Sequence, residues 1–329
     1  MSDIVVSSRV RLARNYEDLP FRGKISAQQC EECISRTLSA LRELPEAYTY
    51  LPMQGMESNE KKVLMESHLI SPDLLREEEG AAVLVRTDEK IAVMMNEEDH
   101  LRIQAFAPGD RLPEAAQNAF SLDDTLQKQL SFAFDSQLGY LTACPTNTGT
   151  GMRASMMLHL PMLTLFKQMG KVGQLAAKVG LTLRGIYGEG SEAQGNLYQL
   201  SNQVTLGRTE EELTQAVTAT ARQMAEMERV FRERAWEKDP VAFEDQLFRS
   251  FGLLTNARRM NVKEFMAHWS NLRLGAAMEK LPVHTEACDA LLTAAQPAHV
   301  LKAMGSALKA SEADTYRCDI IRRAIRGGN

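Results

Sequence analysis

The stretch LTACPTNTGTGMRAS (141–155) combines residue types that could do chemistry. The lone Cys144 precedes a proline, and two glycines then lead to Arg153. Such a cysteine can be a nucleophile, a packed thiol, or a thiolate that contacts a charged ligand. The glycines are typical of a phosphate-binding loop, but the lysine that such loops require is missing. This segment alone leaves the alternatives open.

Three further segments concentrate charge beside apolar runs. In SSRVRLAR, Arg9 and Arg11 would share one face of an extended strand. The other charged residues are Glu97, Glu98, Asp99, His100 and Arg102 of NEEDHLR, and Arg184 and Glu189 of LRGIYGEGSE. Any one segment would most often be solvated surface or a turn. Together, the arginines could bind a polyphosphate and stabilise a transferred phosphoryl group, and the carboxylates would then need a cation to face.

The composition narrows the function classes. Hydrophobic residues make up 44% of the 329 positions, and the net charge of −5 argues against a nucleic-acid or membrane-surface binder. No apolar run approaches the roughly 18 residues of a membrane-spanning helix, and we expect no secretory signal. Five cysteines make no disulfide framework, which favours the cytoplasm. Arginines outnumber lysines 25 to 13, and guanidinium groups bind phosphate oxygens in a bidentate way.

The pair Cys30 and Cys33 in CEEC could suggest a metal or redox site. No second cysteine pair follows at the spacing of a zinc site. We therefore expect two thiols on one helix, with no bound metal.

The apolar pattern predicts strands and helices in the first two-thirds of the chain. Residues 81–106 are expected to form three strands, and residues 181–207 two strands around a glycine-rich loop. Residues 123–139 have helical spacing, with two aspartates suited to the first turn. Residues 153–180 are expected to form one or two helices, interrupted near Pro161 and Gly170.

A long helix and a helical domain are expected to follow. Residues 209–212 resemble a capping box that opens the helix. Its expected buried stripe contains Leu213, Val217, Met224 and Phe231. From about Asp239 onward the pattern stays helical. The sequence therefore predicts an α+β domain over residues 1–238 and a helical domain over residues 239–329.

The four charged motifs, in this order, resemble the phosphagen (guanidino) kinases, most closely the bacterial protein arginine kinases. The resemblance runs from about Ser7 to the C-terminus and is tightest over residues 80–210. It implies a twisted antiparallel sheet flanked by helices, an all-helical C-terminal domain, and Mg²⁺-ATP as the phosphoryl donor.

The resemblance also implies roles for individual residues. The arginines expected to cradle the phosphates of ATP are Arg9, Arg11, Arg102, Arg153 and Arg184. His68 matches a histidine that packs on the adenine, and Glu98 and Glu189 match carboxylates that hold the acceptor guanidinium beside Cys144. Further ATP contacts are expected at Ser7, Ser8, Val10, Ala154, Ser155, Met156, Met157, Gly185, Ile186, Tyr187, Gly188 and Glu189.

These roles agree with the chemistry of a guanidinium acceptor. A guanidinium is a poor nucleophile until one nitrogen loses its proton, and Glu98 is the expected base. Cys144 is expected to be a thiolate whose pKa is lowered by surrounding arginines and which orients the acceptor electrostatically. Magnesium would sit mainly on phosphates and water, with Glu97 at most contacting its water shell.

The acceptor is predicted to be an arginine side chain of a protein. Glu189 offers a carboxylate to an unsubstituted guanidinium, which favours arginine over creatine. The kinases of free amino acids carry an additional N-terminal helical domain that holds the amino-acid end, and this sequence reaches SSRVR at residue 7. Two alternatives stay open: an arginine kinase acting on free arginine, and a weakly active scaffold that binds phosphoarginine.

Near the C-terminus the sequence departs from the resemblance. Protein arginine kinases carry an Arg-Asp-x-x-Arg-Ala motif that binds phosphoarginine, and the aligning segment is ADTYRC, residues 313–318. Asp314 and Arg317 match, whereas Ala313 and Cys318 do not, so this regulatory site is expected to be weakened. The resemblance further implies a homodimer, a zinc-binding activator protein and a Clp-type protease as partners.

Overall fold

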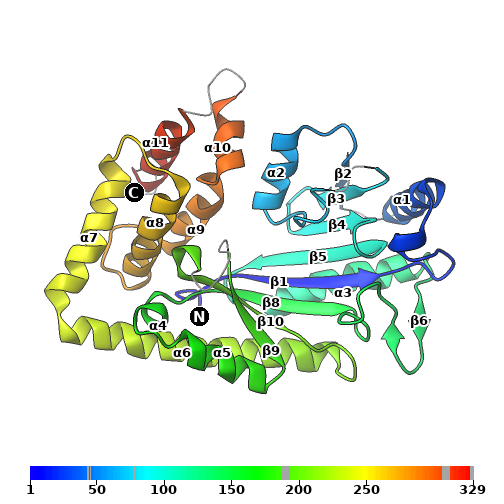
Figure 1. The fold of residues 1–329 in the computed structure, drawn as a ribbon, viewed down its shortest axis with the longest axis horizontal. Coiled ribbons are helices and arrows are strands. Elements are labelled where there is room, and N and C mark those ends of the chain that lie inside the picture. The colour runs from blue at the N-terminus through cyan, green and yellow to red at the C-terminus, as the bar shows by residue number, and fades with distance from the viewer. Residues whose placement is uncertain (43, 45, 77–78, 187–192, 306–311, 327–329) are drawn as a thin grey trace.

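The centre of the fold is an eight-stranded, fully antiparallel sheet with the strand order β2-β3-β4-β5-β1-β8-β10-β9 (Figure 1). The computed structural model covers residues 1–329 and describes all of them except 43, 45, 77–78, 187–192, 306–311 and 327–329. The strands are β1 (Val5–Arg14), β2 (Tyr48–Pro52), β3 (Ala82–Arg86), β4 (Ile91–Met95), β5 (Leu101–Pro108), β8 (Met152–His159), β9 (Leu181–Gly185) and β10 (Leu197–Asn202). A separate hairpin joins β6 (Phe134–Asp135) and β7 (Gly139–Tyr140).

Helices cover one face of this sheet because strands such as β1 and β8 place apolar residues there at alternate positions. Val10, Ala154 and Met156 point into the main apolar core together with residues of the covering helices. Those helices are α1 (Ala27–Leu41), α3 (Leu112–Gln127), α5 (Met169–Lys178) and α6 (Glu210–Lys238). On the opposite face, α2 (Ser58–Glu66) and the segment after it cover only the end of the sheet at β3 and β4. The middle of that face stays open.

The long helix α6 begins as its sequence predicts. The Thr209 side chain accepts a hydrogen bond from the Glu212 amide, and the Glu212 side chain accepts one from the Thr209 amide. Leu213, Val217 and Met224 of the predicted stripe are buried, and Phe231 is partly buried against both apolar cores. At the end of α6, Asp239 accepts a hydrogen bond from the Ala242 amide and so caps the next helix.

The C-terminal domain is entirely helical among its described residues. Its helices are α7 (Pro240–Asn256), α8 (Val262–Ala277), α9 (Thr285–Ala294), α10 (Pro297–Met304) and α11 (Ala313–Arg326). They share an apolar core around Phe265 and Trp269, which Val6, Met162 and Leu197 enter from the first domain. The division between residues 238 and 239 remains a prediction, while the fold class, an α+β domain followed by helices, is confirmed.

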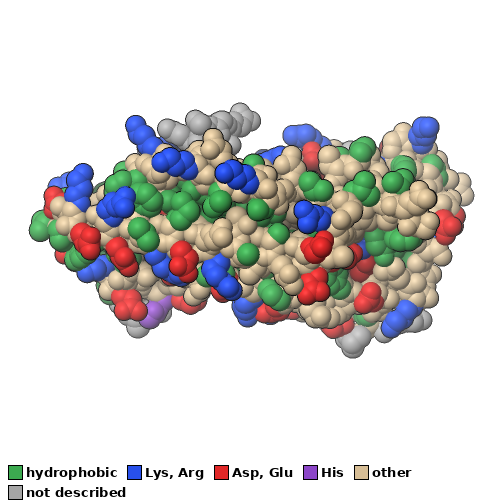
Figure 2. Space-filling model, turned by 90° about the horizontal axis from the view of Figure 1, so that it is seen from below, with side chains coloured by type: hydrophobic (Ala, Val, Ile, Leu, Met, Phe, Trp, Pro, Cys, Tyr) green, Lys and Arg blue, Asp and Glu red, His purple; other side chains and the backbone are tan. Residues whose placement is uncertain are grey.

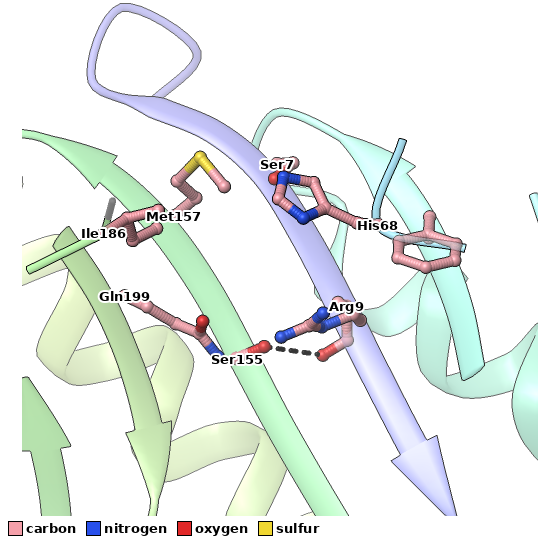
Figure 3. Close-up of a pocket in the computed structure, with 8 residues that line it drawn as sticks. Ser7, Arg9, His68, Ser155, Met157, Ile186 and Gln199 are labelled. Carbon is pink, nitrogen blue, oxygen red and sulfur yellow. Dashed lines mark hydrogen bonds between the residues drawn. The ribbon is translucent and has the colours of Figure 1, made fainter. Parts of the chain in front are cut away.

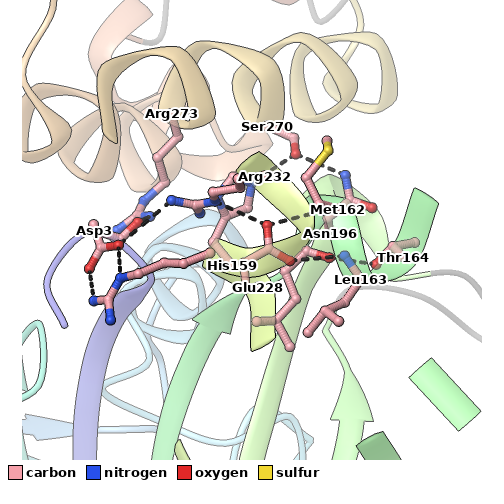
Figure 4. Close-up of polar contacts among 12 residues, drawn as sticks. Asp3, His159, Met162, Leu163, Thr164, Asn196, Glu228, Arg232, Ser270 and Arg273 are labelled. Carbon is pink, nitrogen blue, oxygen red and sulfur yellow. Dashed lines mark hydrogen bonds and ion pairs between the residues drawn. The ribbon is translucent and has the colours of Figure 1, made fainter. Parts of the chain in front are cut away.

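Polar contacts also join the helical domain to the sheet (Figure 4). The Oγ atom of Ser270, in α8, lies 2.8 Å from His159 Nε2 at the end of β8. It lies at the same distance from Asn196 Nδ2. Asn196 belongs to the short helix η2 (Gln194–Asn196) that precedes β10. Arg273 of α8 donates to the backbone oxygen of Asp3. The helical domain therefore supports the ends of two sheet strands.

Two helix predictions were wrong, one of them only in its first part. Residues 123–139 do not begin a helix: α3 begins at Leu112 with a proline in its first turn, and Asp123 near its end pairs with buried Arg14 at 2.6 Å. The helices predicted over 153–180 are present only from Pro161 onward, as α4 (Pro161–Leu165) and α5, whereas residues 152–159 form β8, which pairs with β1 on one side and with β10 on the other. Pairing with two neighbouring strands outweighs the helical propensity of its methionines and leucine.

The three strands over 81–106 and the pair over 181–207 are confirmed. Cys30 and Cys33 lie one turn apart on α1, both buried and neither in a disulfide, and burial raises the pKa of Cys33 to about 12. A short helix η1 (Arg22–Lys24) and α4 (Pro161–Leu165) complete the described elements. Within the described part of the chain, no helix is long and apolar enough to cross a membrane.

Candidate active site

The open face of the sheet carries a row of arginines. In the register of the sheet, Arg11 of β1 lies opposite Arg153 of β8, and Arg102 of β5 lies opposite Ala13 of β1. Arg184 of β9 joins the same face through cross-strand pairs in β10 and β8. Residues directly opposite each other in an antiparallel sheet point to the same side. The structure therefore brings all five predicted phosphate-binding arginines, Arg9, Arg11, Arg102, Arg153 and Arg184, to one face.

These guanidinium groups crowd one another. Burial, and then the charges of Arg9, Arg102 and Arg153, lower the pKa of Arg11 well below its ordinary value. Burial, and then the charge of Arg184, lower the pKa of Arg153. An arginine stays protonated in a protein, so the shifts measure how strongly its environment disfavours further positive charge. A polyanion bound on this face would relieve that repulsion.

One carboxylate group and two buried N–H donors complete this surface. Glu97, which is buried, holds Arg102 in an ion pair of 2.7 Å and also binds Ser71. The Nε atoms of Arg11 and Arg102 are buried and have no hydrogen-bond partner among the described residues. Buried donors without partners are costly, so their presence here indicates a ligand that accepts hydrogen bonds.

A pocket lies at the end of the arginine row where β1 begins. Figure 3 shows His68 and Arg9 on one side and Met157, Ile186 and Gln199 on the other. Ser7, Phe106 and Ser155 complete the lining. Burial, and then Arg9, lower the pKa of His68 to about 4, so its ring is neutral at pH 7. A neutral aromatic ring beside apolar side chains suits a flat heterocycle.

The other end of the row carries the predicted acceptor site. Glu98 is exposed in the turn between β4 and β5, and its Oε2 lies 3.5 Å from Asn147 Nδ2 in the Cys144 loop. Partial burial of its carboxyl group, and then the negative charges of Asp99 and Glu97, raise the pKa of Glu98. The charges of Cys144 and Glu98 both act on Arg153. The structure thus places these two predicted catalytic groups together, beside the arginines.

Asp99 holds this end of the site together, a role that the sequence did not reveal. It is 2% exposed, and its Oδ1 accepts hydrogen bonds from Asn15 Nδ2 at 2.6 Å and the Ala143 amide at 2.7 Å. Asn15 in turn accepts a hydrogen bond from the His100 amide. Asp99 therefore ties the backbone before Cys144 to the turn that carries Glu98. In the sequence, nothing distinguishes Asp99 from its acidic neighbours.

The glycines after Cys144 serve close packing. Gly149 has φ +120°, and a Cβ there would lie 2.6 Å from the Thr205 oxygen. Gly151 has φ +64°, and its Cβ would lie 2.7 Å from the Ala13 oxygen. Only glycine accepts both the conformation and the contact. The packing of this loop against its neighbours therefore accounts for these two glycines.

Some predicted contacts do not reach the open face with their side chains. Ser8, Val10, Ala154 and Met156 alternate with the site residues on β1 and β8 and are buried on the helix-covered face. Their contribution is to hold the two strands. Gly185 is also a spacer, because a Cβ there would lie 3.0 Å from Ala193. Tyr187, Gly188 and Glu189 lie outside the described residues.

Asp314 and Arg317, the two residues that match the C-terminal motif, form bonds within the helical domain. Arg317 is 2% exposed and donates to Asp314 Oδ1 at 2.5 Å. It also donates to the backbone oxygens of Met260 and Ala295, each at 2.8 Å. These contacts fasten α11 to the rest of the helical domain. The expectation that this motif is degenerate stays a prediction, and its two matching residues have a structural use here.

Comparisons with known proteins agree with this geometry. Residues 29–231 match the family described as ATP:guanido phosphotransferase, C-terminal catalytic domain. Residues 240–328 match the family described as Protein-arginine kinase McsB C-terminal domain. The chain is 42% identical over 334 residues to the protein-arginine kinase of Syntrophomonas wolfei, covering 99% of this chain and 93% of that one. It is 44% identical over 331 residues to that of Brevibacillus brevis, covering 99% and 92%.

Solved structures share the catalytic fold. The duplicated taurocyamine kinase from Schistosoma mansoni with bound transition-state analogue components has a TM-score of 0.65 and 27% identity, covering 74% of this chain and 36% of that chain. The match to lombricine kinase has a TM-score of 0.64 and 23% identity, and it covers 71% of this chain and 68% of that chain. This match shows the fold alone. By its motifs, its fold and its full-length relatives, the chain belongs to the ATP:guanido phosphotransferase family, within its protein-arginine kinases.

Proposed function

We propose that this enzyme transfers the γ-phosphoryl group of ATP to arginine side chains of proteins. One observation carries the proposal: the site is laid out in a line along β1. The pocket of His68 and Ser7 lies at one end, the arginines follow, and Glu98 and Cys144 lie at the other end. Adenine, phosphates and acceptor would occupy these regions in turn. The relatives named as protein-arginine kinases support the choice of acceptor.

The residues of this line account for the transfer. Glu98 would take one proton from the acceptor guanidinium, leaving a nitrogen lone pair free to attack the γ-phosphorus. The new N–P bond forms while the bond between phosphorus and the bridging oxygen of ADP breaks, and ADP leaves. The arginines stabilise charge on the transferred group, and Cys144 as a thiolate would orient the acceptor without forming a covalent bond. Glu189, outside the described residues, is the proposed second carboxylate.

Magnesium would arrive with the nucleotide. No group of three His, Cys, Asp or Glu side chains that could hold a metal ion occurs among the described residues. Mg²⁺ prefers phosphate oxygens and water, with few protein ligands. When bound, it would neutralise phosphate charge, and the chain's arginines would supply the other cationic contacts.

We also propose that the enzyme works in the cytoplasm, where reducing conditions keep its five cysteines out of disulfides. There the product would replace a positive charge on the target with a negative one. We propose that this marks proteins for degradation by a Clp-type protease or regulates a stress response, with a zinc-binding protein as activator.

Homodimerisation through the helical domain is proposed as well. Val230, Val241, Phe248 and Leu253 of α6 and α7 are exposed. Figure 2, seen from below, shows hydrophobic side chains among charged ones at the end of the molecule formed by the helical domain. Exposed apolar residues that gather on one face are typical of an interaction surface.

A comparison of two acceptors, assayed separately, tests which kind of arginine the enzyme phosphorylates. The enzyme is incubated with Mg²⁺-ATP and either an unfolded model protein or free arginine, and ADP release is followed for both. We expect turnover with the protein, none with the Cys144→Ala enzyme, and little with free arginine. Turnover with free arginine alone would replace the proposal with a metabolic arginine kinase. Turnover with neither acceptor, with the proposed activator present, would favour the scaffold.

A further inference from the structure

A carboxylate of the catalytic domain caps a helix of the C-terminal domain. Glu66, the last residue of α2, accepts hydrogen bonds from the backbone amides of Ala298 at 2.9 Å and His299 at 3.1 Å. These amides lie in the first turn of α10, whose own cap residue, Gln296, makes no side-chain capping bond. A carboxylate at a helix N-terminus satisfies free amides and complements the helix dipole. The two domains are therefore joined at this point by a specific contact.

The side chain of His299 strengthens the same contact. Its Nδ1 lies 2.9 Å from Glu66 Oε2, and its Nε2 lies 3.1 Å from Ser67 Oγ. One neutral tautomer satisfies both bonds, because Nδ1–H donates to the carboxylate while Nε2 accepts from the serine hydroxyl. His299 is 20% exposed and Glu66 only 11%. His299 of the helical domain thus bonds to both Glu66 and Ser67 at the end of α2.

The next residue in the chain is His68, which lines the nucleotide pocket. Its φ of +60° is a left-handed conformation that a non-glycine residue seldom adopts. The His68 amide donates to Met65, and the Leu69 amide donates to Leu64, which is the pattern of a Schellman cap. Gln104 donates to the His68 oxygen from the site face of β5. The position of the His68 ring therefore depends on the last turn of α2.

We propose that His299 is a positioning residue for nucleotide binding. Through Glu66 and Ser67, it holds the end of α2 in the conformation that places His68 in the pocket. The helical domain thereby contributes to ATP affinity without touching the nucleotide. This inference rests on the proposed function, because it takes the pocket of His68 to be the adenine site.

Calorimetric titration of the full-length enzyme with Mg²⁺-ATP tests the proposal. We expect His299→Ala to weaken ATP binding about fivefold. His299→Asn, which keeps a donor where Nδ1 lies, should recover part of the loss. His268→Ala is the matched control, because His268 is also partly buried and bonds a serine, Ser250, but within the helical domain. It should bind ATP as the wild type does.

A double substitution separates a specific role from a general loss of structure. His68→Asn tolerates the left-handed backbone but removes the ring. If His299 acts through His68, adding His299→Ala to His68→Asn should weaken binding little further. Wild-type affinity in His299→Ala, an equal loss in His268→Ala, or full additivity in the double variant would each overturn the inference. A wild-type enzyme that binds no ATP would instead overturn the proposed function.

Discussion

The Oδ1 atom of Asp99 accepts a hydrogen bond from the backbone amide of Ala143 at a distance of 2.7 Å. This bond joins the two segments that carry Glu98 and Cys144. Because Asp99 is buried and also binds Asn15, it cannot turn away to another partner without leaving a donor unsatisfied. The geometry of the acceptor site thus depends on a residue that need not touch the acceptor.

Replacing Asp99 should therefore slow transfer more than it weakens ATP binding. We expect Asp99→Asn to lower kcat about tenfold, since small misplacements of reacting groups are costly in rate. Steady-state kinetics and an ATP titration measure the two effects separately. Asp88→Asn, at an exposed aspartate paired with Arg86, is the control and should change neither. An unchanged kcat in Asp99→Asn would contradict the positioning role.

The pH dependence of transfer should report Glu98. Its pKa is raised above the ordinary value of about 4.5 by burial and by neighbouring carboxylates. A base acts in its deprotonated form, so activity should be full above this raised pKa and should fall as the pH drops through it. The acid limb of kcat/KM against pH should shift in Glu98→Asp. An acid limb identical to that of the wild type would assign it to another group.

Arg11 should lower the thermal stability of the enzyme when no nucleotide is bound. Its guanidinium is crowded by three other arginines, and its buried Nε has no hydrogen-bond partner in the part of the chain that the structure describes. We expect Arg11→Met to raise the Tm of the free enzyme by about 1–4 °C, as relief of strain at functional sites commonly does. It should also weaken ATP binding by about 30-fold or more.

Differential scanning calorimetry and nucleotide titration check both parts. Arg249→Met, which removes an exposed ion pair with Asp245 on α7, should alter neither quantity appreciably. A lower Tm together with unchanged ATP affinity in Arg11→Met would show that Arg11 is structural.

Gly151 should be intolerant of a side chain. Gly151→Ala would force a left-handed alanine and bring its Cβ to 2.7 Å from the Ala13 oxygen, so we expect a loss of about 2 kcal/mol or more in the free energy of unfolding. Gly170→Ala is a matched control in α5, where a Cβ meets nothing within 4 Å. That change should be neutral or stabilising by up to about 1 kcal/mol. Equal effects in urea denaturation would contradict the packing argument.

The sequence predicted the fold where the local pattern and the tertiary structure agree. The apolar runs of β3 and β4 and the capping box of α6 are local signals, and all were confirmed. β8 was predicted as helix because its strand character comes from pairing with β1 and β10, which are far away in sequence. The same distance hid Asp99, whose partners are at positions 15 and 143.

The arginines of the site were predictable by type but not by arrangement. Residue types and motif order indicated phosphoryl transfer, while the strand register was needed to show that Arg11 and Arg153 are direct neighbours on one face. The link from His299 to the end of α2 had no signal in the sequence, because it joins two exposed-looking polar residues more than 230 positions apart.

The most direct test of the central claim is to locate the transferred phosphate. An unfolded model protein is incubated with Mg²⁺-ATP and the enzyme, kept away from acid, and analysed by mass spectrometry beside a Glu98→Gln reaction. We predict phosphate on arginine side chains with the wild type and a loss of about 100-fold or more with Glu98→Gln, which should still bind ATP. Phosphate on serine, threonine or tyrosine, or equal transfer by Glu98→Gln, would contradict the account.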